Sequence, residues 1–283
     1  MTTRNQTLLP QQISNFAHHL AIEEKSAATI EKYLYVVRTF ADWLAGRTIT
    51  KELATEWKAD LSAKGYAPAT VNAMLSALNS LFDFLKLLEC RVRFLKVQRR
   101  LFRDAGRELT KSDYQRLLST AHRLGRRRLA LLLETICATG IRVSEIQYIT
   151  VEAAERGKAE INLKGKVRVI LLPGKLCRKL LKYTQKQKTA FGAIFRTKSG
   201  KCMSRRQIWA ELKGLCKHAD VNPRKVFPHN LRHLFATMFY KACHDIVKLA
   251  DLLGHSNIET TRIYLIASGA EHRWELDRLG LVV

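Results

Sequence analysis

The sequence predicts a mainly α-helical protein of two domains, with one small antiparallel β-hairpin in the second domain. Apolar residues recur at helical spacing between capping and stop residues over most of the 283 positions, whereas strict alternation marks one short stretch. A chain of this length can bury two modest cores, so two domains are expected.

Four helical segments fill roughly the first ninety residues. The first is predicted over 11–24. The second begins after Ser26, a residue type that caps helices, and stops at Gly46. The third ends at a glycine, and the fourth carries Pro68 near its start, where the missing N–H costs little. We expect residues 1–100 to form a compact bundle.

A segment rich in Arg and Lys follows, between Cys90 and Arg107. We interpret it as the connection between the domains and place the linker at residues 101–106. A basic connector would follow a DNA backbone, and the alternative is a charged surface loop.

The second domain, residues 107–283, is expected to mix helices with the hairpin. Thr110 and Asp113 have the spacing of a helix start, and an apolar helix from Leu129 ends at Gly140. Alternating residues flank a tight turn at 164–166, which predicts the hairpin. Further on, Ser204 is placed to cap another helix.

Residues 226–264 bring a His, an Arg, a second His and a Tyr together in helical surroundings. His229, Arg232 and His233 fall at i, i+3 and i+4, so they share one helix face. A histidine pair at this spacing also suggests zinc, but no HExxH string or further ligand trio accompanies it, so we expect no metal.

An apolar helix then stops at Gly254, and His255 follows at the break. Ser256 and Glu259 have capping-box spacing for a new helix, which would carry Tyr264 about 13 Å beyond His255 at about 1.5 Å per residue. The two side chains would then meet a substrate between them, but not each other.

The charge balance predicts a polyanionic partner. Lys and Arg number 49 against 25 Asp and Glu, for a net charge of +24. Neutralising phosphates releases condensed counterions, so nucleic acid is the expected partner. A hydrophobic fraction of 47% indicates a folded interior rather than a basic tail, and no lipidation signal or long apolar run suggests a membrane.

Six scattered cysteines without a Cys-x-x-Cys pair fit free thiols, and the first residues do not read as a secretion signal. We therefore expect a cytoplasmic protein.

Four strings in order resemble the catalytic domain of tyrosine recombinases, the phage integrase and Xer family. They are A-T-G-I-R-V-S-E-I at 138–146, His-x-x-Arg, Leu-Gly-His and Thr-Thr-x-x-Tyr. In the first domain, T-I-x-x-Y and A-x-x-T-V-N-x-x-L-S-A-L resemble the family's SAM-like core-binding domain. The resemblance implies a short, Xer-like enzyme that cuts and rejoins specific DNA sites.

The resemblance also implies the roles of individual residues. Tyr264 would attack a phosphodiester and form a 3′-phosphotyrosyl bond, while arginines clamp the nonbridging oxygens with their planar donors. Because the bond energy is kept in the phosphotyrosine, no cofactor is expected. The catalytic candidates are Arg142, Lys164, His229, Arg232, His255 and Tyr264, with Glu145 orienting or charge-balancing the site.

The family's catalytic lysine lies on such a hairpin, usually within Gly-Lys-Gly-x-Lys-x-Arg. Here Leu163 replaces the first glycine and one turn residue is missing. Lys164 is the predicted general acid for the leaving 5′-oxygen, and Lys166 remains the alternative.

Two groups of residues are predicted to contact DNA. Arg and Gln side chains read guanine and adenine edges, so the helix after Ser204 is the candidate for sequence readout. The alternative is that its residues contact only phosphates. The first domain would grip the other side of the duplex, unless its residues only form a solvated face. The candidates are Lys32, Arg38, Lys64 and Asn72 in the first domain and Arg205, Arg206, Gln207 and Lys213 in the second.

By resemblance, two copies would bind each double-stranded site and four would form the synapse, with an accessory protein as a further partner. The last helix, with Trp274, would pack on its own domain or dock on a neighbour. Two other functions remain open: a type IB topoisomerase, and a DNA-binding regulator without catalysis.

Overall fold

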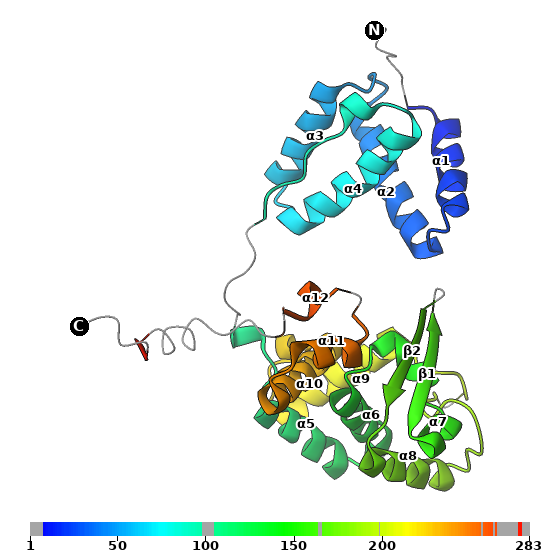
Figure 1. Cartoon of the computed structure of the whole chain (residues 1–283), viewed down its shortest axis with the longest axis vertical. Helices are drawn as coiled ribbons and strands as arrows, with labels where there is room; N and C mark the ends of the chain where they lie inside the picture. Colours follow the sequence, from blue (N-terminus) through cyan, green and yellow to red (C-terminus); the bar gives the residue numbers. More distant parts are fainter. Residues whose placement is uncertain are drawn as a thin grey trace. The chain divides into compact units, whose positions relative to one another are not determined.

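The computed structural model describes residues 8–97, 105–163, 166–197, 199–255, 257–262, 264 and 277–278. The chain divides into two compact units, Met1–Arg99 and Arg100–Val283, both drawn in Figure 1. The described residues are mainly helical, with a two-stranded antiparallel sheet in the second unit, which confirms the predicted fold class. None of the described helices is long and apolar enough to cross a bilayer.

The first unit is a bundle of four helices around an aromatic core. The rings of Phe40 and Trp57 meet edge to face, 5.0 Å between centroids. Ser26 caps the second helix through the Thr29 amide, and Pro68 opens the fourth helix, as predicted. The elements are α1 (Pro10–Ile22), α2 (Ala27–Leu44), α3 (Lys51–Ala63), α4 (Pro68–Phe84) and the 3₁₀ turn η1 (Leu88–Cys90).

Residues 91–97, which begin the basic segment after Cys90, are fastened to the first unit. The Asn79 amide exchanges two hydrogen bonds of 2.9 Å with the backbone of Val92. Asn72 does the same with Leu95, at 2.9 and 2.8 Å. Two side-chain amides thus replace the strand partner that an extended segment would otherwise need. We therefore assign Asn72 a structural role, which the sequence did not predict.

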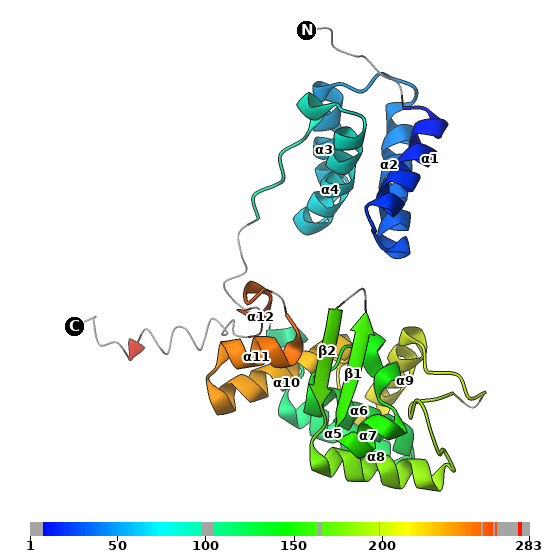
Figure 2. The same ribbon diagram turned by 45° about the vertical axis from the view of Figure 1, so that its right-hand side comes forward.

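The second unit is organised around α6, which is buried nearly all round and packs against α5, α8 and α10. Figures 1 and 2 show α8 and α12 at opposite ends of this unit. Its elements are η2 (Ala105–Arg107), α5 (Lys111–Arg123), α6 (Arg127–Thr139), η3 (Val143–Tyr148), α7 (Val151–Arg156), β1 (Lys158–Leu163), β2 (Lys166–Leu171), α8 (Gly174–Lys186), α9 (Arg205–Ala219), η4 (Pro223–Lys225), α10 (Pro228–Cys243), α11 (Ile246–Leu253) and α12 (Glu259–Arg262).

The predicted hairpin is present, with Ile161 paired to Arg168 and Glu160 to Val169. Ile161 and Ile170 are buried on one face, whereas Val169 is exposed on the other. Arg168 shares the inward face because side chains alternate along a strand. The predicted general acid, Lys164, lies outside the described residues.

Two glycines end helices where the functional side chains begin. Gly140 closes α6 and Gly254 closes α11, each in the left-handed conformation with φ of +62°. Glycine adopts this conformation without the steric cost that a Cβ brings. The chain can therefore turn sharply and present Arg142 after the first break and His255 after the second.

Candidate functional site

A cavity of about 850 Å³ in the second unit gathers most of the predicted catalytic residues. Residues from η3, α9, α10 and the segment after α11 meet there, although more than a hundred positions separate the first from the last. The polar side chains that line it are Arg142, Ser144, Arg205, Arg206, His229, Arg232, His255, Thr260 and Tyr264.

Arg232 is the most enclosed cation of this cavity, with 3% of its surface exposed. Its guanidinium donates to the Gly140 carbonyl, to the Leu253 carbonyl at 2.7 Å and to His255 Nε2 at 2.9 Å. Burial lowers the pKa of Arg232, and the hydrogen bond to Tyr264 opposes that change. The carbonyls hold the guanidinium at the ends of α6 and α11, and charge-assisted bonds of this kind are strong.

Glu145 is buried beside Arg142, with 3% of its surface exposed. Arg142 donates to it twice, from Nη1 at 2.8 Å and from the backbone amide at 3.0 Å. Burial alone would raise the pKa of Glu145, but hydrogen bonds from Arg142 and the charges of Arg168 and Arg142 outweigh it and lower that pKa. The carboxylate is therefore ionised, and it is buried while it pairs with Arg142.

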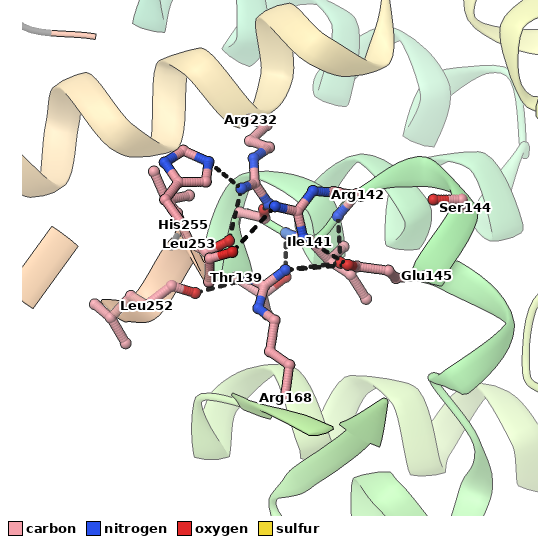
Figure 3. A network of polar contacts seen from close by, with 12 residues as sticks. Thr139, Ile141, Arg142, Ser144, Glu145, Arg168, Arg232, Leu252, Leu253 and His255 are labelled. Atoms are coloured by element: carbon pink, nitrogen blue, oxygen red, sulfur yellow. Dashed lines mark hydrogen bonds and ion pairs between the residues drawn. The ribbon is translucent and has the colours of Figure 1, made fainter. Parts of the chain in front are cut away.

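Arg168 belongs to the same network, and the sequence analysis did not single it out. Its guanidinium donates to Glu145 Oε2 at 2.9 Å and to the Leu252 carbonyl at 2.7 Å. Figure 3 shows it below Arg142 and Arg232, with Glu145 between two of the guanidinium groups. One signal was available: Arg168 occupies the final position of the Gly-Lys-Gly-x-Lys-x-Arg string.

His255 is held in one tautomer by its neighbours. A guanidinium can only donate, so Nε2 must accept the bond from Arg232. Nδ1 then carries the proton and donates to Thr261 Oγ1 at 2.9 Å. Burial and the charges of Arg232, Arg142 and Arg168 lower the pKa of His255 to about 4, so the ring is neutral at pH 7.

Tyr264 corrects one prediction. Its ring stacks on His255, with 5.9 Å between centroids and 13° between planes, so the two side chains do meet each other. The expected separation assumed a continuous helix, whereas α12 spans only Glu259–Arg262 and the Tyr264 amide donates to the Thr261 carbonyl in a turn. Tyr264 is 2% exposed and packs in the same cavity as the arginines of its own chain.

His233 contacts Tyr264 and Thr237. Its ring meets Tyr264 edge to face at 5.1 Å, and its Nδ1 lies 3.4 Å from Thr237 Oγ1. Within the part of the chain that the structure describes, no three His, Cys, Asp or Glu side chains come together as metal ligands would. We therefore interpret His233 as a packing partner of Tyr264.

The predicted DNA-contacting residues fall into two groups in the structure. Arg205 and Arg206 line the cavity, whereas Gln207 caps its own helix by accepting from the Ser204 amide at 2.9 Å. Lys213 donates to the Pro223 carbonyl. In the first unit, the predicted cations Lys32, Arg38 and Lys64 are exposed. Lys64 pairs with Asp60 at 2.8 Å.

The lowered pKa of His255 predicts a pH dependence of stability. Between about pH 4 and 6.5 the His255 side chain is protonated in the unfolded chain but not in the folded chain. Its contribution to the free energy of unfolding is therefore fully present above pH 6.5 and is lost as the pH drops toward 4. His255→Gln can keep both hydrogen bonds without titrating, so the thermal midpoint should vary less with pH. Thermal unfolding from pH 4.5 to 7 measures this.

The matched control is His18→Gln, at an exposed position of α1. It should leave the pH dependence of the midpoint as in the wild type. Equal slopes for His255→Gln and the wild type would contradict the assignment of a neutral His255.

Comparison with known proteins gives consistent matches over both units. Residues 107–270 match the phage integrase family, and residues 13–87 match the phage integrase N-terminal SAM-like domain. The tyrosine recombinase XerA of Pyrococcus furiosus is 30% identical over 289 residues, covering 99% of this chain and 97% of that protein. The tyrosine recombinase XerC of Roseiflexus castenholzii is 31% identical over 282 residues, covering 90% of this chain and 88% of that protein. A crystal structure of a lambda integrase tetramer bound to a Holliday junction shares the fold, with a TM-score of 0.73 at 17% identity over 93% of this chain and 78% of that chain.

Proposed function

Because the chain belongs to the phage integrase family and is a tyrosine-type site-specific DNA recombinase, we propose that Tyr264 is its nucleophile. The phenolic oxygen attacks the scissile phosphorus, the bond to the 5′-oxygen breaks, and a 3′-phosphotyrosyl bond remains. One observation supports this most directly: Tyr264 lies in one cavity with Arg142 and Arg232 of the same chain.

The arginines stabilise the charge that develops on the nonbridging oxygens. In-line displacement concentrates negative charge there, and preorganised cations stabilise it without rearranging during the reaction. Arg232 is fixed by two carbonyls, His255 and Tyr264, and Arg142 by Glu145 and the Gly254 carbonyl. A planar guanidinium has five N–H donors, so each arginine retains at least one donor for a phosphate.

A neutral imidazole removes the phenolic proton. A phenol with an ordinary pKa near 10 is a poor nucleophile until it is deprotonated. His229 and His255 both lie near Tyr264, with ring centroids at 6.1 and 5.9 Å. Burial and the charge of Arg232 lower the pKa of His229, so it too is neutral at pH 7. Because Nε2 of His255 already accepts from Arg232, His229 is the better candidate for the base.

We assign the general acid to Lys164, which would protonate the leaving 5′-oxygen. Lys164→Ala should slow cleavage of an ordinary site by about 10²- to 10⁴-fold, the range expected for losing a general acid. A 5′-thiolate leaves without a proton, so a 5′-thio substrate should restore cleavage by this variant. Single-turnover rates on the two substrates measure the effect. If Lys166→Ala is rescued in place of Lys164→Ala, the assignment moves to Lys166.

DNA binding is proposed to use both units. Arg205 and Arg206 would contact the duplex near the scissile phosphate, and Lys32, Arg38 and Lys64 would contact it from the first unit. The lambda integrase tetramer bound to a Holliday junction supports a tetramer in the synapse, and we propose a dimer on each site. The predicted last helix, with Trp274, lies outside the described residues apart from positions 277–278. We propose that the protein acts in the cytoplasm.

A trapping experiment tests the function. A binding site is selected from random duplexes, the scissile phosphate is mapped, and a nick is placed so that the short 5′-hydroxyl fragment diffuses away. The wild-type protein should then form a denaturation-resistant adduct on the selected site only. Equal adduct on random DNA would indicate topoisomerase-type activity, and binding without adduct would indicate a regulator without catalysis.

A further inference from the structure

The carboxyl end of α11 binds three different arginines through three consecutive carbonyls. Leu252 accepts from Arg168 at 2.7 Å and Leu253 accepts from Arg232 at 2.7 Å. The Gly254 carbonyl accepts from Arg142 at 3.3 Å. Carbonyls at a helix end have no partner within the helix and carry partial negative charge, so guanidinium groups are favoured there.

Arg168 is the member of this group that does not line the cavity. It lies on the inward face of β2, and 12% of its side chain is exposed. Besides the Leu252 carbonyl, it donates to both oxygens of Glu145, at 3.2 and 2.9 Å. One side chain therefore joins the hairpin to the Arg142 loop and to the end of α11, three segments that lie far apart in the sequence.

The packing beside Gly254 is fitted to Arg168. A Cβ on Gly254 would lie 2.4 Å from Arg168 Cδ and 2.5 Å from Arg168 Nε. Real Cβ atoms do not approach other atoms so closely, so any larger residue would displace the arginine. Glycine is therefore required at position 254 for two reasons: the left-handed backbone and the close approach of Arg168.

Arg168 also sets the charge that a phosphate would meet. Arg142 and Glu145 alone form a neutral pair, whereas Glu145 shared between Arg142 and Arg168 leaves one positive charge. With Arg232 the total is two positive charges instead of one. Glu145 and Arg232 are buried, where solvent screens charges less, so a difference of one charge is large enough to change a rate.

We propose that Arg168 is a positioning residue for DNA cleavage. It fixes the end of α11, so that Arg142 and Arg232 are aligned with the scissile phosphate. It also balances the charge of Glu145, so that the positive charge of Arg142 is not cancelled. This inference rests on the proposed function. It predicts that loss of the Arg168 charge matters when the phosphate is charged and much less when it is neutral.

The test compares Arg168→Gln and Arg168→Lys on the nicked site with a phosphodiester or a methylphosphonate at the scissile position. A methylphosphonate lacks the charged nonbridging oxygen. Arg168→Gln should cleave the phosphodiester about 10- to 100-fold more slowly than the wild type, the range known from metal sites when a residue that orients a ligand by hydrogen bonds is lost. On the methylphosphonate its rate should fall within about threefold of the wild type. Arg168→Lys keeps the charge and should restore most of the phosphodiester rate.

A matched control separates this effect from the general loss of positive charge. Lys158, on the same sheet, is 47% exposed and pairs with Glu160. Lys158→Gln removes one charge outside the network and should cleave both substrates at the wild-type rate. An equal loss by Arg168→Gln on both substrates would mean that Arg168 only supports folding, and would overturn the proposal.

A second pair of variants covers the case in which Arg168→Gln does not fold. Gly254→Ala displaces Arg168, whereas Gly157→Ala has the same backbone strain, at φ of +71°, with open space around its Cβ. Gly254→Ala should show the phosphodiester-specific loss and Gly157→Ala should not. If the wild type forms no adduct, the proposed function fails; if the wild type cleaves and Gly254→Ala matches Gly157→Ala on both substrates, only this inference fails.

Discussion

Tyr264→Phe is expected to abolish the covalent protein–DNA adduct while leaving DNA binding unchanged within about twofold. The reason is chemical: phenylalanine keeps the ring that stacks on His255 but has no oxygen to attack phosphorus. Removing the nucleophile should lower the cleavage rate by at least about 10³-fold, since the remaining groups act only on a bond that nothing attacks. Adduct formation on the nicked site, followed in denaturing gels, measures this result.

Tyr240 supplies the matched control. It belongs to α10, packs in the same small apolar cluster as Tyr264 and has its ring 5.6 Å from His244. Tyr240→Phe should form the adduct at the wild-type rate. An adduct that persists in Tyr264→Phe and disappears in Tyr240→Phe would move the nucleophile to α10.

Arg232→Gln is expected to have the second largest effect, on cleavage and on stability together. The cleavage rate should fall about 10²- to 10³-fold, as when one preorganised donor to a developing oxyanion is removed. Stability should also fall, because the buried carbonyls of Gly140 and Leu253 lose a donor and each unpaired buried acceptor costs about 1–3 kcal/mol. Single-turnover cleavage and thermal unfolding measure the two effects separately.

Arg224→Gln is the control for Arg232→Gln, because Arg224 is exposed in η4 and outside the cavity. It should lower neither the cleavage rate nor the thermal midpoint appreciably. If Arg232→Gln cleaves at the wild-type rate while remaining folded, Arg232 is not the phosphate-binding arginine that we propose.

Much of the fold followed from short-range patterns. The caps at Thr110 and Ser204 are present, each in a capping box, because a side chain and an amide three residues apart suffice to make one. The hairpin and the stops at Gly140 and Gly254 are present for the same reason. The resemblance in the A-T-G-I-R-V-S-E-I string likewise indicated Arg142 and Glu145, which bond to each other three residues apart.

The errors arose where a local rule was extended over a longer distance. Helical rise placed Tyr264 far from His255, but α12 is only one turn long and the rings stack. The sequence also did not predict that buried Asn79 and part-buried Asn72 bind the backbone of residues 91–97. In both places a contact between distant positions decided the local structure.

The sequence by itself therefore determined the helices, the hairpin, the family resemblance and the identity of the chemical groups. Only the tertiary structure decided how those groups share acceptors: Arg168, Arg232 and Arg142 meet the three carbonyls at the end of α11, and Glu145 lies between two of them. The physical reason is range. Caps, periodicity and turns act over about four residues, whereas these bonds join positions up to 112 residues apart and form only once packing has brought the segments together.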